Sequence, residues 1–389
     1  MNSTSHLHST PLRRSALAVV IAVLALLVLV GPTPRADANP PFDPVEPEIG
    51  LDYGGSAGTV LDLYVPDFPG TAKLPLLIWS NGCAWLAPPA FCGVAGTAGI
   101  AAEFNPRGYA VAGVGIASSS GAAFPTQLHD IRAAIRWLRQ HAADYNLDPN
   151  RFAIMGFSSG GWTSVIAGTT SDDALPGEPN TNGLANGVSS AVQAAVGFSS
   201  PTDFLQMDAW FNAENCGSRP LPPPWGFDFF PPRFDLCSAI QHDRPLNPLP
   251  LPGVIPIATA SPESLLVGCT GPGVLLGIQA CPDDTQAANP IKYVQGSEVP
   301  TLLLHGFVDP LVPHGQSELL YEALAAAGNE VTFISAADAG HSPDQIRASQ
   351  SVTVFHTNRG GNETIRTGSA SWETIEHFIH VALSRARGG

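Results

Sequence analysis

The chain has 389 residues, 44% of them hydrophobic and 13% charged, and a formal net charge of −15. That length allows a large core and about one to three domains. So small a charged fraction excludes a mainly disordered acidic chain. The 33 Asp and Glu residues outnumber the 18 Lys and Arg residues, which leaves no basic surface for a phosphate backbone. Nucleic acid is therefore not expected as a partner.

The N-terminus has the pattern of a secretory signal peptide. Arg13 and Arg14 precede an apolar run from Ala16 to Val30, and Ala36-Asp37-Ala38 follows. A basic segment, an apolar segment and a small-x-small site predict a signal peptide at residues 1–38. The run is shorter than the roughly 20 residues that span a bilayer, so an uncleaved anchor is the weaker interpretation. We expect residues 39–389 to be secreted, extracellular or periplasmic, with no membrane span after cleavage.

The six cysteines are even in number, and the exported context is oxidising. No pair has the C-x-x-C spacing of a zinc or redox site, so disulfides are expected. Sequential pairing would close three short loops, although six cysteines allow fifteen connectivities. The sequential pairs are Cys83–Cys92, Cys216–Cys237 and Cys269–Cys281.

Extended and helical patterns alternate along most of the mature chain. Apolar runs typical of strands cover Val60–Val65, Leu74–Trp79, Tyr109–Ile116, Phe152–Met155, Ala194–Phe198, Thr301–Leu304 and Val331–Ile334. Helical spacing covers Leu128–Leu138, Glu318–Ala327 and Trp372–Ser384, and the turn Asp148-Pro149-Asn150 is expected to stop the chain before its next strand. Val352–Phe355 could add a strand. This alternation predicts an α/β fold with a mostly parallel sheet.

One stretch, about residues 203–290, shows neither the strand pattern nor the helix pattern. It holds four of the six cysteines, and eleven of the 37 prolines lie between Pro220 and Pro256. Long stretches of this kind are lids, binding loops or linkers. The α/β pattern resumes afterwards with strands that could not form a domain alone. We therefore interpret it as a Pro-rich, disulfide-stapled cap inserted into one domain, with a linker between two domains as the alternative.

A nucleophile motif follows the strand at Phe152–Met155. Gly156-Phe157-Ser158-Ser159-Gly160 has the G-x-S-x-G pattern and precedes a helix. In a strand–turn–helix context this is the nucleophile elbow of α/β-hydrolases, in which the serine hydroxyl stands above the sheet at a helix N-terminus. Ser158 is thus the predicted nucleophile. The N–H of the next residue, Ser159, is a predicted oxyanion donor, together with a donor from the loop at residues 80–85.

The acid and the base are expected later in the chain, in the order Ser, Asp or Glu, His. Asp309 follows the strand at Thr301–Leu304, and His341 lies in the loop after the next strand. In such a triad the histidine carries the serine proton and the aspartate orients the imidazole. Asp338 is an alternative acid. His305 is interpreted as a structural hydrogen-bonding residue, and His314, His356, His377 and His380 as surface or packing residues. No residue cluster has metal-ligand spacing, so neither a metal nor another cofactor is expected.

Three segments together resemble the bifunctional feruloyl/acetyl-xylan esterase type of α/β-hydrolase, which is related to hormone-sensitive-lipase-like carboxylesterases. They are Asp130–Leu138, Phe152–Gly161 and His305–Pro313. The resemblance implies the triad Ser158, Asp309 and His341. By position, Asn81-Gly82-Cys83-Ala84-Trp85 matches the family's His-Gly-Gly-Gly/Ala-Trp segment, so the oxyanion donors would be Cys83, Ala84 and Ser159.

This chain departs from the family pattern at Asn81 and Cys83. A Cβ at Cys83 restricts the backbone, so the oxyanion loop could be misaligned, or a Cys83–Cys92 disulfide could hold it in place. The leading expectation is a secreted serine carboxylesterase that acts on small or polymer-linked esters through an acyl-enzyme. A serine peptidase on the same fold and a non-catalytic binding protein are the alternatives.

Overall fold

The computed structural model describes eight stretches of the chain. They are residues 46–67, 72–91, 93–171, 187–207, 261–271, 274–275, 277–296 and 299–386. The predicted signal peptide and the middle of the predicted cap lie outside the described residues, as do Cys92, Cys216 and Cys237.

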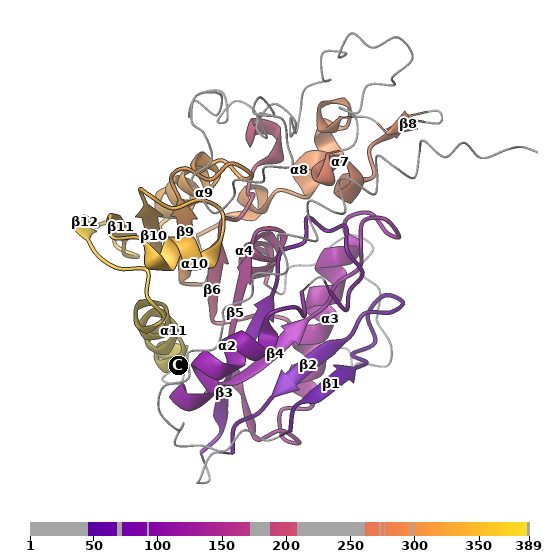
Figure 1. Ribbon diagram of the computed structural model, residues 1–389, viewed down its shortest axis with the longest axis vertical. Helices are drawn as coiled ribbons and strands as arrows, with labels where there is room; N and C mark the ends of the chain where they lie inside the picture. Colours follow the sequence, from indigo (N-terminus) through magenta and orange to yellow (C-terminus); the bar gives the residue numbers. More distant parts are fainter. Residues whose placement is uncertain are drawn as a thin grey trace, which may run out of the picture.

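A single large mixed sheet organises the fold (Figure 1), with strand order β1-β2-β4-β3-β5-β6-β9-β10-β11-β12. The strands from β4 to β10 in that order run parallel, and the two on either side of them are antiparallel. Their bounds are β1 Glu48–Leu51, β2 Leu61–Tyr64, β3 Leu74–Ser80, β4 Ala110–Val114, β5 Leu147–Phe157, β6 Ala194–Phe198, β9 Thr301–Gly306, β10 Val331–Ala336, β11 Val352–Thr357 and β12 Glu363–Thr367. The predicted α/β fold with a mostly parallel sheet is confirmed.

Helices cover both faces of this sheet. The longer ones are α2 Thr97–Phe104, α3 Thr126–Gln140, α4 Ser159–Thr170, α9 Gly315–Ala326 and α11 Trp372–Ala386, and α10 spans Pro343–Ala348. Short 3₁₀ turns are η1 Asn105–Arg107 and η5 Pro290–Tyr293. Buried side chains of α3, α4 and α9 pack on one face of the sheet, and those of α2, α10 and α11 pack on the other. The parallel strands β3, β4, β6 and β9 are buried on both sides, as parallel strands in such folds require, whereas the edge strand β12 is exposed.

The predicted turn at Asp148-Pro149-Asn150 is wrong. These residues lie inside β5, which begins at Leu147. Leu147 pairs with Leu74 of β3, and the next pair joins Phe152 to Leu76. The intervening residues of β5 therefore bulge out of the ladder, which accommodates a proline that has no N–H to donate. The turn-forming residues mark a bulge and not the end of an element.

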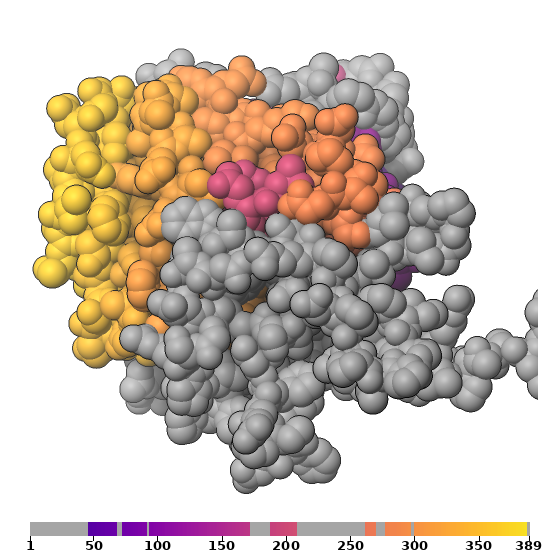
Figure 2. All heavy atoms as spheres, turned by 90° about the horizontal axis from the view of Figure 1, so that it is seen from above, coloured from indigo at the N-terminus to yellow at the C-terminus, as the bar shows by residue number. Residues whose placement is uncertain are grey.

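The two ends of the predicted cap pack onto the domain. η2 Phe204–Gln206 leads into the cap, and α7 Pro262–Val267, β7 Thr270–Gly271, β8 Val274–Leu275, η4 Ile278–Ala280 and α8 Pro282–Ala287 lead out of it. A disulfide joins Cys269 to Cys281, one of the three predicted pairs. Figure 2 shows residues 187–207 in magenta next to residues 261–296 in orange, on the face seen from above. Both cap ends thus meet on one surface of the molecule.

Candidate active site

The Gly-x-Ser-x-Gly motif forms a sharp turn between β5 and α4. Ser158 stands between the two elements with φ 57° and ψ −123°, a backbone conformation that non-glycine residues rarely adopt. A Cβ on Gly156 would lie 2.0 Å from the Gly160 carbonyl oxygen, and one on Gly160 would lie 1.9 Å from the Ser80 oxygen. Both motif positions therefore require glycine. The strained serine backbone is typical of a functional site.

Asp309 and His341 lie against each other after neighbouring strands. Asp309 follows β9 and His341 follows β10, and these strands pair in parallel. His341 Nδ1 lies 2.7 Å from Asp309 Oδ2, so the imidazole donates its Nδ1 proton to the carboxylate. Asp309 Oδ1 accepts the N–H groups of Leu311 and Val312. Burial alone raises the pKa of the Asp309 carboxyl, but His341 and His305 outweigh burial and lower the pKa below its ordinary value.

The alternative acid, Asp338, lies elsewhere in the same loop. Its carboxylate accepts a hydrogen bond from the Ser349 hydroxyl, and that contact lowers the pKa of Asp338. The carboxylate that faces His341 is therefore that of Asp309.

The elbow and the histidine loop meet at the ends of β5 and β10. The Ser158 N–H donates to the Phe198 carbonyl at the end of β6, and the ring of Phe157 lies 4.8 Å from the ring of His341. The Ser199 hydroxyl donates to the His341 carbonyl. Within the described residues Ser158 Oγ makes no hydrogen bond of its own. Such catalytic contacts often tighten only when substrate binds.

The loop after β3 packs directly on the elbow. A Cβ on Gly82 would lie 2.6 Å from the Phe157 oxygen and 2.6 Å from Ser158 Cβ, so this position requires glycine. Ala84 and Trp85 both have positive φ. The Trp85 carbonyl accepts the N–H of Ser119, which anchors the far end of the loop. The strained backbone is thus fixed at both ends next to Ser158.

The three predicted oxyanion donors are not equivalent. The Cys83 N–H donates to Ser159 Oγ at 2.8 Å, so this N–H already has an acceptor within the protein. Cys83 is also disulfide-bonded, and its predicted partner Cys92 lies outside the described residues. Within the described part of the chain, the N–H groups of Ala84 and Ser159 donate to no acceptor. These two groups are the donors that the geometry offers to a substrate oxygen.

Aromatic rings lie between this loop and the ends of the cap. Trp85 packs edge-on against Trp162 at 5.4 Å and Phe204 at 5.7 Å. Trp162 also contacts the ring of Phe124, and its Nε1–H donates to the carbonyl of Ala288. Trp162 is fully buried, so it packs in the core and couples α4 to the exit of the cap.

One further histidine contacts Asp309, and a second lies beside that histidine. His305 Nε2 is 3.2 Å from Asp309 Oδ2, and the ring of His314 lies 5.6 Å from that of His305. Both side chains are buried. A structural role is expected from the sequence for His305, and a surface or packing role for His314. The i,i+4 spacing of His305 and Asp309 is compatible with their contact, but the spacing alone does not distinguish it from packing.

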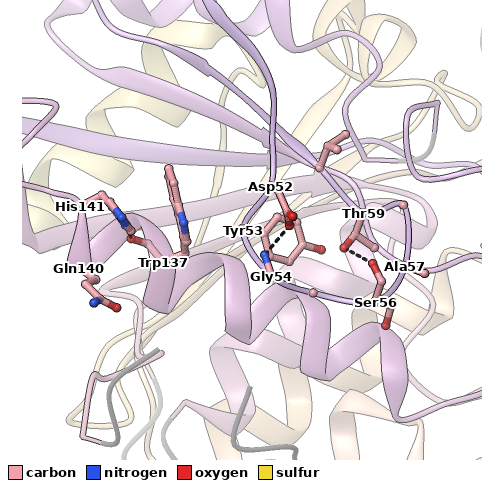
Figure 3. Close-up of a pocket in the computed structure, with 12 residues that line it drawn as sticks. Asp52, Tyr53, Gly54, Ser56, Ala57, Thr59, Trp137, Gln140 and His141 are labelled. Atoms are coloured by element: carbon pink, nitrogen blue, oxygen red, sulfur yellow. Dashed lines mark hydrogen bonds between the residues drawn. The ribbon is translucent and has the colours of Figure 1, made fainter. Parts of the chain in front are cut away.

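A cavity of about 690 Å³ lies apart from these residues. Figure 3 shows it between the loop at residues 52–60 and α3, with the stacked rings of Trp137 and His141 at one side. None of the predicted catalytic residues lines it. In the described part of the chain, no three His, Cys, Asp or Glu side chains cluster as metal ligands do. No described helix has the length and apolar character needed to cross a bilayer.

A comparison with protein families decides the affiliation of the chain. The BD-FAE family model matches residues 61–219 and 257–324, more than half of the chain. The chain belongs to the BD-FAE family. The resemblance seen in the sequence is thus confirmed, and the fold is that of an α/β-hydrolase. The match includes Ser158 and Asp309 and ends before His341.

Curated relatives and solved structures agree with this affiliation. Esterase LipQ of Mycobacterium tuberculosis is 25% identical over 76% of this chain and 56% of its own length. Esterase LipC of the same organism is 23% identical over 78% and 62%. The chain thus spans little more than half the length of these relatives.

Among solved structures, a truncated carbohydrate esterase from gut microbiota is similar with a TM-score of 0.62 and 24% identity, covering 90% of this chain and all of that one. A bifunctional GH43-CE protein of Bacteroides eggerthii has a TM-score of 0.57 and 25% identity, covering 90% and 36%. These solved structures thus share the fold of this chain.

Proposed function

We propose that the chain is a carboxylic ester hydrolase that acts through an acyl-enzyme on Ser158. The observation that carries the proposal is the 2.7 Å contact between His341 Nδ1 and Asp309 Oδ2, formed where β9 and β10 end beside the nucleophile elbow. The names of the curated relatives and the family affiliation support ester hydrolysis. The contact supports Ser158, Asp309 and His341 as the triad, because it orients the imidazole as a base.

The geometry supports a two-step reaction. Ser158 Oγ attacks the ester carbonyl carbon while its proton passes to His341 Nε2, the ring nitrogen that does not face Asp309. The carbonyl oxygen becomes an oxyanion, and the N–H groups of Ala84 and Ser159 stabilise it. The C–O bond to the alcohol breaks, and the alcohol leaves with the proton from His341. A water molecule then repeats the sequence on the acyl-enzyme and releases the acid.

The surroundings of the site bear on the substrate class. The ring cluster of Trp85, Trp162 and Phe204 joins the oxyanion loop to the ends of the cap. The similar solved protein from gut microbiota is described as a carbohydrate esterase. We therefore propose esters linked to carbohydrate as the first substrate class to test, next to small aryl and alkyl esters.

Export is a separate part of the proposal. The basic and apolar segments of residues 1–38 support a cleaved signal peptide, and the Cys269–Cys281 disulfide is compatible with an oxidising compartment. Expression of the full chain in a secreting bacterial host, with N-terminal sequencing of the product, tests it. We expect the mature chain outside the cytoplasm to begin at Asn39. Retention of residues 1–38 in the cytoplasmic fraction would contradict export.

Hydrolysis of an ester series tests the catalytic proposal. The substrates are p-nitrophenyl esters from acetate to palmitate, methyl ferulate and acetylated xylan, with a proline-containing peptide as the amide control. Wild type and Ser158→Ala are compared under oxidising conditions, and Ser369→Ala, an exposed serine between β12 and α11, is the matched control. We expect activity in wild type and Ser369→Ala and a loss of at least about 1,000-fold in Ser158→Ala.

Three outcomes would contradict this proposal. Equal activity of wild type and Ser158→Ala would remove Ser158 from the reaction. Cleavage of the peptide but of no ester would make the enzyme a peptidase. Inactivity on both classes, in a protein with a cooperative melt, would favour a binding role.

A further inference from the structure

A buried histidine outside the proposed triad contacts its acid. His305 is the penultimate residue of β9, and its side chain is fully buried. Its Nε2 lies 3.2 Å from Asp309 Oδ2 and 3.0 Å from the Val312 carbonyl oxygen. Both neighbours are hydrogen-bond acceptors only, because the carboxylate is ionised. Nε2 must therefore carry a hydrogen.

The other ring nitrogen faces a hydroxyl group, which suits this protonation. His305 Nδ1 lies 2.7 Å from the hydroxyl of Ser317 on α9. A neutral imidazole with its proton on Nε2 has a lone pair on Nδ1, and the Ser317 O–H donates to it. Ser317 is itself buried, so water does not compete for this contact. Three segments thus surround the ring: β9, the loop that follows it and α9.

Both oxygens of the Asp309 carboxylate thereby face N–H groups. The N–H groups of Leu311 and Val312 donate to Oδ1. His341 donates to Oδ2, and His305 Nε2 lies 3.2 Å from that same oxygen. Without His305, one oxygen of a buried carboxylate would depend on His341 alone. A partner of this kind holds a catalytic group in place and also moderates how strongly that group attracts the proton of the base.

We propose that His305 is a positioning residue for the reaction: its Nε2–H, held in place by Ser317, fixes the Asp309 carboxylate against His341. The inference rests on the proposed function, because Asp309 and His341 act there as acid and base. His305 does not touch the substrate and transfers no proton. It acts through Asp309 by holding one carboxylate oxygen and sharing its charge.

Histidine ring NMR tests the contact without any need for turnover. In ¹⁵N-labelled wild type we expect the His305 signals of a neutral ring protonated at Nε2. A proton found on Nδ1 of a neutral ring would overturn the proposal, because Nε2 would then face two acceptors without a hydrogen. The second signal is the Nδ1 proton of His341, which lies in the hydrogen bond to Asp309.

Three variants separate positioning from packing. His305→Leu removes the donor, and we expect the His341 Nδ1 proton to move downfield because Asp309 then attracts it more strongly. We expect kcat to fall about 10-fold with KM changed less than about 2-fold. His305→Gln places an amide N–H near the position of Nε2 and should recover most of kcat. Ser317→Ala releases the tautomer and should move both readouts in the same direction by less.

A control and the contrary results complete the test. His356→Gln changes a histidine on β11 that contacts Thr332 near the start of β10, away from the strand ends that carry Asp309 and His341, and it should leave both readouts unchanged. A folded His305→Leu with an unmoved His341 signal and unchanged kcat would overturn the proposal. If His305→Leu does not fold, an unmoved signal and unchanged kcat in Ser317→Ala would do so. Wild type that hydrolyses no ester would refute the proposed function, whereas the NMR signals would still report on the contact.

Discussion

The Cys83 N–H and the Ser159 hydroxyl form a 2.8 Å hydrogen bond that joins the loop after β3 to the first turn of α4. The two residues are 76 positions apart in the chain. Both belong to the set expected to bind the substrate oxyanion. In the structure the Cys83 N–H instead binds the Ser159 hydroxyl, and this contact holds the oxyanion loop against α4. The N–H groups of Ala84 and Ser159 remain for the substrate.

Ser159→Ala tests this clamp. Loss of the hydroxyl leaves the Cys83 N–H without its acceptor, so we expect the free energy of unfolding to fall by about 1 kcal/mol. The loosened loop should lower kcat about 5-fold to 10-fold with little change in KM. Urea unfolding and ester hydrolysis provide the two measurements. A rise in kcat would show instead that Ser159 Oγ holds back a third oxyanion donor.

Gly82→Ala tests the close packing of that loop on the elbow. The new Cβ would lie 2.6 Å from both the Phe157 oxygen and Ser158 Cβ, so loop and nucleophile must separate. We expect kcat/KM on short esters to fall at least about 10-fold. Gly121→Ala is the matched control, because its Cβ meets nothing closer than 3.8 Å. Full activity of a folded Gly82→Ala would show that the loop can move without cost.

Removal of the Cys269–Cys281 disulfide tests how much this bond stabilises the end of the cap. It closes a loop over a sequence separation of 12, for which chain entropy alone predicts a loss of about 3 kcal/mol on removal. We expect the double variant Cys269→Ser/Cys281→Ser to unfold at lower urea concentration than wild type. Unchanged stability would mean that α7 and α8 hold their positions by packing alone.

Because of the Asp309 carboxyl, we expect the free energy of unfolding to depend on pH in the acid range. Burial raises the pKa of this carboxyl, but His341 and His305 together lower it by more than burial raises it. The pKa in the folded state therefore lies below the ordinary value of 3.8. As the pH falls through that value, the unfolded state binds a proton that the folded state does not, and stability is lost. Asp309→Asn cannot ionise and lacks this dependence.

Urea unfolding at a series of pH values measures that dependence. The difference in unfolding free energy between wild type and Asp309→Asn should be constant near neutral pH. It should shrink as the pH falls below about 4. A difference that stays constant to about pH 2.5, with both proteins still folded, would contradict a lowered pKa.

Local sequence patterns predict most of the strands and helices and the positions of the proposed catalytic residues in the chain. Buried strands gave continuous apolar runs, and the glycine spacing around Ser158 reflects backbone contacts that only glycine allows. Asp309 and His341 were identifiable because each follows a strand at the same edge of the sheet. The Asp148-Pro149-Asn150 segment misled because proline and asparagine mark bulges as well as turns.

Contacts between distant segments could not be read in the same way. The bond between Cys83 and Ser159 depends on how closely the loop after β3 approaches α4, which no single segment encodes. His305 and His314 gave no distinctive local signal, because a buried histidine can serve packing or chemistry. Their role follows only from the acceptors that surround the rings in three dimensions.

Covalent labelling tests the central claim, that Ser158 is the nucleophile, most directly. Wild type, Ser158→Ala and Asp309→Asn would be treated with a fluorophosphonate, digested and mapped by mass spectrometry. We expect one adduct on Ser158 in wild type, none in Ser158→Ala and much slower labelling in Asp309→Asn. An adduct on another residue, or no adduct on a folded wild type, would contradict the account.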